Sequence, residues 1–148
     1  MAGYKRGEKY TATLANKVTI QVVKSNIYGE KTDAIVTLAN SGLLFADLNE
    51  DGGGEKVVTE SRAWVKEHGP VPTGMCAFTS GGKLRSKYMI HAVGPVWSQS
   101  KGPEFNCALL ATTIVSVLET AEQLACKSIS LSILASGFPT NLYSETLY

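Results

Sequence analysis

A continuous apolar segment, Ala34 to Ala39, is the feature that most constrains the fold of this chain. It does not alternate apolar and polar residues, as a strand with one face in water would. Such a run is typical of a strand covered by helices on both faces, so we expect it at the centre of a sheet. Asn40 ends the segment, and a triple glycine, Gly52 to Gly54, precedes a predicted helix. A strand end followed by such a loop points to nucleotide binding.

The rest of the pattern predicts strands and helices that alternate within a single domain. In chain order we expect strands at 10–14 and 18–24 joined by a turn, the strand 34–39, a helix at 55–67, strands at 75–79 and 87–93, a helix at 106–125 capped by Asn106, a strand at 128–134, and the first turns of a helix at 142–148. This order implies an α/β fold of three layers, with helices on both faces of a mixed sheet.

Ligands of such sheets bind beyond the carboxyl ends of the strands. A second loop, Ser136 to Phe138, also follows a predicted strand. We therefore expect both this loop and Gly52 to Gly54 at that end of the sheet. Backbone N–H groups in both loops would hold a diphosphate.

The composition excludes several classes of protein. The formal net charge is +1, so no strong general attraction to nucleic acid is expected. Met1 to Tyr10 lacks the apolar segment of a secretory signal, and we expect an intracellular protein. The uncharged stretch from Phe105 to Leu118 is too short to span a membrane, and we interpret it as part of a core helix.

No metal or cofactor site is predicted. The three cysteines are far apart in sequence and include no Cys-x-x-Cys pair, so neither disulfides nor zinc is expected. Asp47 to Gly52 matches the opening of an EF-hand calcium loop, but the twelfth position falls on Val58 instead of a glutamate. His68 and His91 have no neighbouring metal ligands in sequence, and we expect structural roles for both.

Five segments, in this order and spacing, resemble the macrodomain family, whose members bind ADP-ribose. They are Asp33–Ser41, Gly52–Val58, Val71–Gly74, Lys87–Pro95 and Ile133–Phe138. The resemblance runs from about Val18 to the end of the chain and implies one macrodomain-like module over residues 1–148. Because the chain ends soon after the second loop, we expect C-terminal elements of the family to be missing.

The resemblance implies a set of ligand-binding residues. They are Asn26 and Ile27 beside adenine, Asn40 with its neighbour Ala39 beside the distal ribose, Gly52, Gly53 and Gly54 against that ribose and the phosphates, and Ser136, Gly137 and Phe138 at the diphosphate. Taken alone, each asparagine could instead cap a turn, and that alternative stays open.

The chain departs from the family at four places. Asn26 replaces an acidic residue, which removes charge assistance in the bond to adenine. The stretch Leu43 to Asp51 is longer than usual and adds three carboxylates. Glu55 stands near the position of the aspartate in hydrolytic members. The second loop lacks a further glycine.

Three functions follow as hypotheses. The first is binding of ADP-ribose, free or attached to proteins as single units or polymer. The second is an ADP-ribosyl hydrolase in which Asn40 and Glu55 position the ribose and an attacking water. The third is a degenerate module that contacts protein or, weakly, RNA; its basic cluster Lys83, Arg85 and Lys87 beside Tyr88 could touch RNA phosphates.

Overall fold

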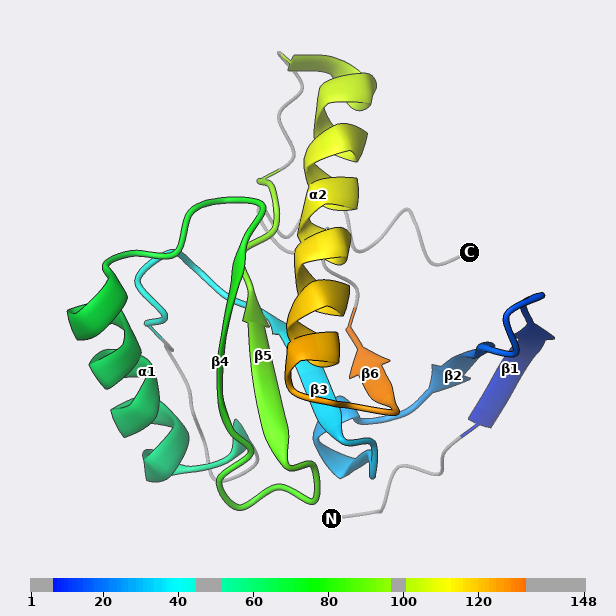
Figure 1. Cartoon of the computed structure of the whole chain (residues 1–148), viewed down its shortest axis with the longest axis horizontal. Coiled ribbons are helices and arrows are strands. Elements are labelled where there is room, and N and C mark those ends of the chain that lie inside the picture. The colour runs from blue at the N-terminus through cyan, green and yellow to red at the C-terminus, as the bar shows by residue number, and fades with distance from the viewer. Residues whose placement is uncertain (1–6, 45–51, 97–100, 133–148) are drawn as a thin grey trace.

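The computed structural model describes residues 7–44, 52–96 and 101–132 (Figure 1). The elements are β1 (Gly7–Thr13), β2 (Thr19–Lys24), the 3-10 turn η1 (Ile27–Gly29), β3 (Ala34–Leu38), α1 (Glu55–His68), β4 (Cys76–Ser80), β5 (Tyr88–Ala92), α2 (Gly102–Gln123) and β6 (Ile129–Leu131). The strands and helices expected before residue 132 are therefore confirmed, with small shifts at their ends. The helix expected at 142–148 lies outside the described residues.

The main sheet has four strands in the order β4-β5-β3-β6. Strand β3 is parallel to both β5 and β6, whereas β4 is antiparallel to β5. The carboxyl ends of β3, β5 and β6 consequently meet at one edge, which we call the carboxyl edge. Their amino ends meet at the opposite edge, the amino edge, together with the β4–β5 loop. About 13 Å of strand separates the two edges along β3.

Helices cover both faces of this sheet. Successive side chains of β3 point to opposite faces, and the side chains on each face pack against a different helix. Ala34 and Val36 pack in one buried cluster with Val117 and Ala121 of α2. Ile35 packs on the other face, in a cluster with Val57 of α1. The predicted three-layer architecture and the central place of β3 are both confirmed.

The hairpin β1–β2 forms a separate two-stranded sheet within the described residues. Its turn is closed by the Leu14 N–H, which donates to the Val18 carbonyl at 2.8 Å. The hairpin stands to one side of the main sheet (Figure 1). The predicted hairpin is thus confirmed, although the described part of the chain does not join it to the other strands.

The predicted start of α2 is wrong. The helix begins at Gly102, with a proline in its first turn, and Asn106 lies one turn inside it. The Asn106 side chain is buried and donates to the Gly102 carbonyl at 2.7 Å, so it does not cap the helix. By length and composition α2 alone among the described helices could cross a membrane; one of its faces packs on β4 and β5, and 22% of the apolar window is buried.

The expected position of the triple glycine is also wrong. The Gly53 carbonyl accepts a hydrogen bond at 3.0 Å from the Lys83 N–H, in the loop between β4 and β5. That loop adjoins the amino end of β5, where Tyr88 pairs with Ala34. Gly52 to Gly54 lie at the amino edge, away from Asn40.

His91 is a buried polar residue in the middle of the α1 face. Its Nε2 lies 2.9 Å from the Thr79 hydroxyl on β4, and the side chain is fully covered. Burial lowers the pKa of His91 to about 4, because the charged imidazolium would lose its hydration. The histidine is neutral in the fold, in agreement with a structural role.

Gly53→Ala should lower the free energy of unfolding by about 2–4 kcal/mol. A Cβ at Gly53 would lie 2.5 Å from the Val57 Cγ2 and 3.0 Å from the Gly81 carbonyl oxygen, and φ is +90°. Gly69→Ala is the control, since its φ is +81° but no atom lies within 4 Å of its Cβ; we expect about 1 kcal/mol there. Equal losses in denaturant titrations would contradict this packing.

The stability of the protein should fall in mild acid because of His91. Below pH 6.5 the unfolded chain binds a proton that the folded chain takes up only near pH 4, so the free energy of unfolding should drop by about 3 kcal/mol across this window. His91→Gln should flatten the profile between these pH values. A wild-type profile in His91→Gln would disprove this assignment.

Candidate functional site

Three segments meet at the carboxyl edge. The Ala39 N–H donates to the Ala92 carbonyl at 2.8 Å and extends the pairing of β3 with β5 by one residue. The Val71 N–H donates to the Ser41 carbonyl at 2.8 Å, and the Gly74 N–H to the Val93 carbonyl at 2.8 Å. Backbone hydrogen bonds therefore hold the loops after β3, α1 and β5 in fixed positions.

Asn40 closes a tight turn at this edge. Its Oδ1 accepts from the Leu44 N–H at 2.9 Å, and its Nδ2 donates to the Leu44 carbonyl at 2.6 Å. Leu43 inside the turn is buried and has a φ of +48°, a conformation that costs a leucine free energy. Asn40 thus has the turn-closing role that its sequence context also allowed. The rest of the long stretch, 45–51, lies outside the described residues.

The same turn has three backbone N–H groups without an acceptor among the described residues. The N–H groups of Asn40, Ser41 and Gly42 donate to no described residue, and Asn40 and Ser41 are exposed. Consecutive N–H groups in a turn form a concave site that suits an anion. This cluster of donors was not predicted from the sequence, which drew attention only to the Asn40 side chain.

The other described candidates lie at the amino edge. Ile27 packs with Tyr28 against the cluster of Ile35, Val57 and Met89, which lie near the starts of β3, α1 and β5. The Asn26 Oδ1 accepts from the Tyr28 N–H at 3.1 Å and caps η1. Together with the glycine loop, these residues form a group separate from Ala39 and Asn40. Gly52 to Gly54 therefore do not lie beside Asn40, as the resemblance implied. The expected contact of Asn26 and Ile27 with adenine stays a prediction.

The predicted catalytic pair is not brought together. Glu55 is the exposed first residue of α1 and follows Gly54 at the amino edge, whereas Asn40 lies at the carboxyl edge. Side chains separated by the length of β3 cannot act on one ribose. The described geometry gives no support to a hydrolytic mechanism that uses both residues.

The second predicted loop, Ser136 to Phe138, lies outside the described residues. The chain approaches it through Ser132, whose N–H and hydroxyl both donate to the Val36 carbonyl, at 3.1 and 3.0 Å. Because β6 is parallel to β3, the chain leaves Ser132 in the direction of the carboxyl edge. The role of Ser136 to Phe138 stays a prediction.

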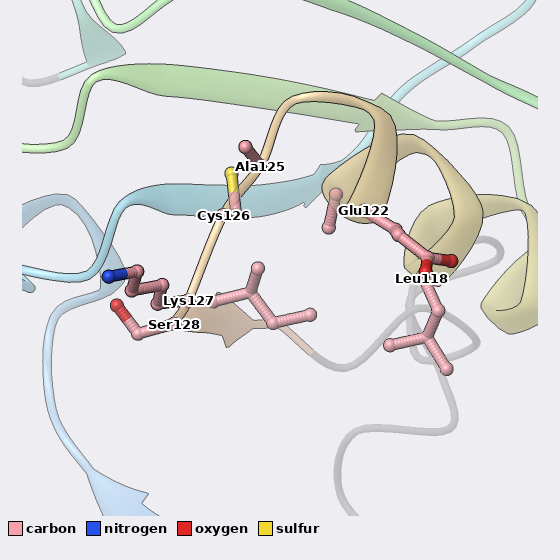
Figure 2. A pocket seen from close by; sticks show the side chains of 8 residues that line it. Leu118, Glu122, Ala125, Cys126, Lys127 and Ser128 are labelled. Atoms are coloured by element: carbon pink, nitrogen blue, oxygen red, sulfur yellow. The ribbon is translucent and has the colours of Figure 1, made fainter.

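A groove of about 360 Å³ lies between α2 and β6. Figure 2 shows Leu118 and Glu122 on α2 at one side and Lys127 and Ser128 before β6 at the other. Burial raises the pKa of the Cys126 thiol there, so the thiol stays protonated. The groove contains none of the predicted ligand residues. Within the described ranges, no group of three His, Cys, Asp or Glu residues could hold a metal.

Relatives of known sequence match most of the chain. It is 37% identical over 131 residues to a macro domain-containing protein of Caldanaerobacter subterraneus, covering 83% of this chain and 73% of that protein. It is 40% identical over 122 residues to an uncharacterised protein of Thermotoga maritima, covering 80% of this chain. The match spans only 20% of the Thermotoga protein.

Solved structures match as well. The Oceanobacillus iheyensis macrodomain with ADP has a TM-score of 0.77 and 27% identity, covering 92% of this chain and 75% of that one. A point mutant of that macrodomain, solved with ADPR, has a TM-score of 0.74 and 28% identity over 90% of this chain and 72% of that one. The family model described as Macro domain matches residues 48–141. The chain therefore belongs to the macro domain family.

Proposed function

We propose that this chain binds ADP-ribose at the carboxyl edge of its parallel strands, through the loops after β3, β5 and β6. The observation that carries the proposal is the similarity, along nearly the whole chain, to a macrodomain solved with ADP. The convergence of three parallel strand ends at one edge supports it independently, because open α/β sheets bind ligands at this place.

The diphosphate is the part of the ligand that the described residues fit best. The N–H groups of Asn40, Ser41 and Gly42 donate to no described residue, and hydrogen bonds to a charged oxygen are stronger than those between neutral groups. The oxygen and the nitrogen of the Asn40 side-chain amide both hydrogen-bond to the Leu44 backbone and hold the turn closed. In this proposal Asn40 acts mainly by fixing these donors, so that little ordering is needed when the ligand binds.

The proposed site does not include the residues expected beside adenine or the triple glycine. Asn26, Ile27 and Gly52 to Gly54 lie at the amino edge, so we leave them out of the proposed site. Ser136 to Phe138 stay in it as a prediction from the sequence. We do not propose hydrolysis, since Glu55 lies far from Asn40.

Titration calorimetry with ADP-ribose tests the proposal. We expect saturable binding at one site, and competition by ADP, which shares the adenosine and the diphosphate. The absence of heat at millimolar ADP-ribose would overturn the proposed function.

Asn40→Ala should weaken ADP-ribose binding by about five- to tenfold, the effect of about 1–1.4 kcal/mol in binding free energy. The substitution removes both bonds to Leu44 and frees the turn. Asn26→Ala is a matched control, because it removes an exposed turn-capping asparagine at the other edge. We expect less than about a twofold change for the control. A larger loss in Asn26→Ala than in Asn40→Ala would place the ligand at the amino edge.

A further inference from the structure

A small basic surface lies at the amino edge, away from the proposed ADP-ribose site. Lys83, Arg85 and Lys87 are all exposed on the seven-residue connection 81–87 between β4 and β5, which contains no acidic residue. The Gly81 N–H donates to the Lys87 carbonyl at 2.9 Å and closes the loop. Among the described residues, none of the three cations forms an ion pair with a carboxylate.

Two aromatic rings adjoin this loop. Phe78 of β4 and Tyr88 of β5 meet edge to face, with ring centroids 6.4 Å apart. The Lys87 ammonium lies 5.1 Å from the centroid of the Tyr88 ring. Phe78 is on the edge strand and remains 41% exposed. The Tyr88 ring therefore contacts both the Lys87 ammonium and the partly exposed Phe78 ring.

The glycine loop fixes the backbone of this surface. The Lys83 N–H bonds to the Gly53 carbonyl, and the aliphatic part of the Lys83 side chain packs over Gly54. Two neighbouring acids already have partners. The Asp33 carboxylate accepts from the N–H groups of Lys127 and Ser128, at 2.7 and 3.1 Å, and the Glu60 carboxylate accepts from the N–H and hydroxyl of Ser80, at 2.7 and 2.9 Å. The exposed Lys127 adds a further cation near this edge.

We propose that Lys83, Arg85 and Lys87, together with Phe78 and Tyr88, form a binding surface for single-stranded nucleic acid. The three cations contact successive phosphates, and an unpaired base stacks on Phe78. A duplex hides its base faces, and an acidic peptide offers charge without rings to stack. The surface lies across the sheet from the proposed ADP-ribose site, so this inference does not depend on the proposed function.

Fluorescence anisotropy with a labelled single-stranded RNA of about 12 nucleotides tests the proposal. Three phosphate contacts predict a slope of about −2 for log K against log salt, or about a 20-fold loss of affinity between roughly 50 and 200 mM salt. A slope near zero would overturn the proposal. Equal or tighter binding of a duplex of the same length, or of a glutamate-rich peptide, would also overturn it.

A charge-removal variant locates the contacts. K83Q/R85Q/K87Q should weaken RNA binding at least about tenfold at low salt and bring the slope close to zero. K17Q/R62Q/K66Q removes two lysines and one arginine from exposed positions on the β1–β2 turn and on α1, and it should change affinity less than about twofold. Equal losses in the two variants would mean that only the net charge matters, which contradicts the proposal. Circular dichroism of K83Q/R85Q/K87Q shows whether the variant is folded, without reference to the proposed ADP-ribose site.

A second variant isolates the stacking contact. Phe78→Leu should weaken RNA binding at least about fivefold with little change in the salt slope. Phe105→Leu is the control: Phe105 is 43% exposed and also has a lysine ammonium, that of Lys101, 4.7 Å from its ring centroid. We expect it to bind RNA as the wild type does. An unchanged affinity in Phe78→Leu would contradict the stacking contact.

Discussion

The parallel pairing of β3 with β5 and β6 determines the arrangement of everything else in this chain. A five-residue strand that is buried on both faces can exist only between two helical layers, and α1 and α2 provide them. Because all three strands run in one direction, their carboxyl ends gather at one edge. The turn whose N–H groups donate to no described residue lies there, and the basic β4–β5 loop lies at the other edge.

The fold could be predicted from the sequence because its signals are local. The apolar run at 34–39 predicted the central strand, and Gly69 after the last apolar residues of α1 ends that helix, its N–H bonding to the Val65 carbonyl. The prediction that Asn106 caps α2 is wrong because a capping residue can be identified only when the start of the helix is known. Here that start lies four residues earlier, at a glycine followed by proline, which the pattern of apolar residues does not mark.

The site could be predicted only in part. Sequence proximity suggested that the triple glycine lies near Asn40, but the two lie at opposite edges of the sheet. The position of Gly53 is decided by a non-local fit against the β4–β5 loop. The Lys83 N–H bonds to the Gly53 carbonyl, and a Cβ on Gly53 would lie only 3.0 Å from the Gly81 carbonyl oxygen. No local pattern carries that information. The positive φ of Leu43 was equally hidden, since leucine rarely adopts it.

The division between the two edges gives the glycines a physical role different from phosphate binding. They bring the start of α1 onto the β4–β5 loop, and in doing so they hold the basic residues of that loop in place. The two edges can therefore serve different ligands: a nucleotide diphosphate at the donors after β3, and a phosphate backbone at the cations before β5.

The central claim, that the nucleotide site lies at the carboxyl edge, is tested most directly by ¹H–¹⁵N correlation spectra of the labelled protein titrated with ADP-ribose. The account predicts that the backbone amides of Asn40, Ser41 and Gly42 shift, while those of Gly53, Gly54 and Lys83 stay unchanged. Shifts concentrated on the glycine loop and Asn26, with none at Asn40 to Gly42, would contradict it.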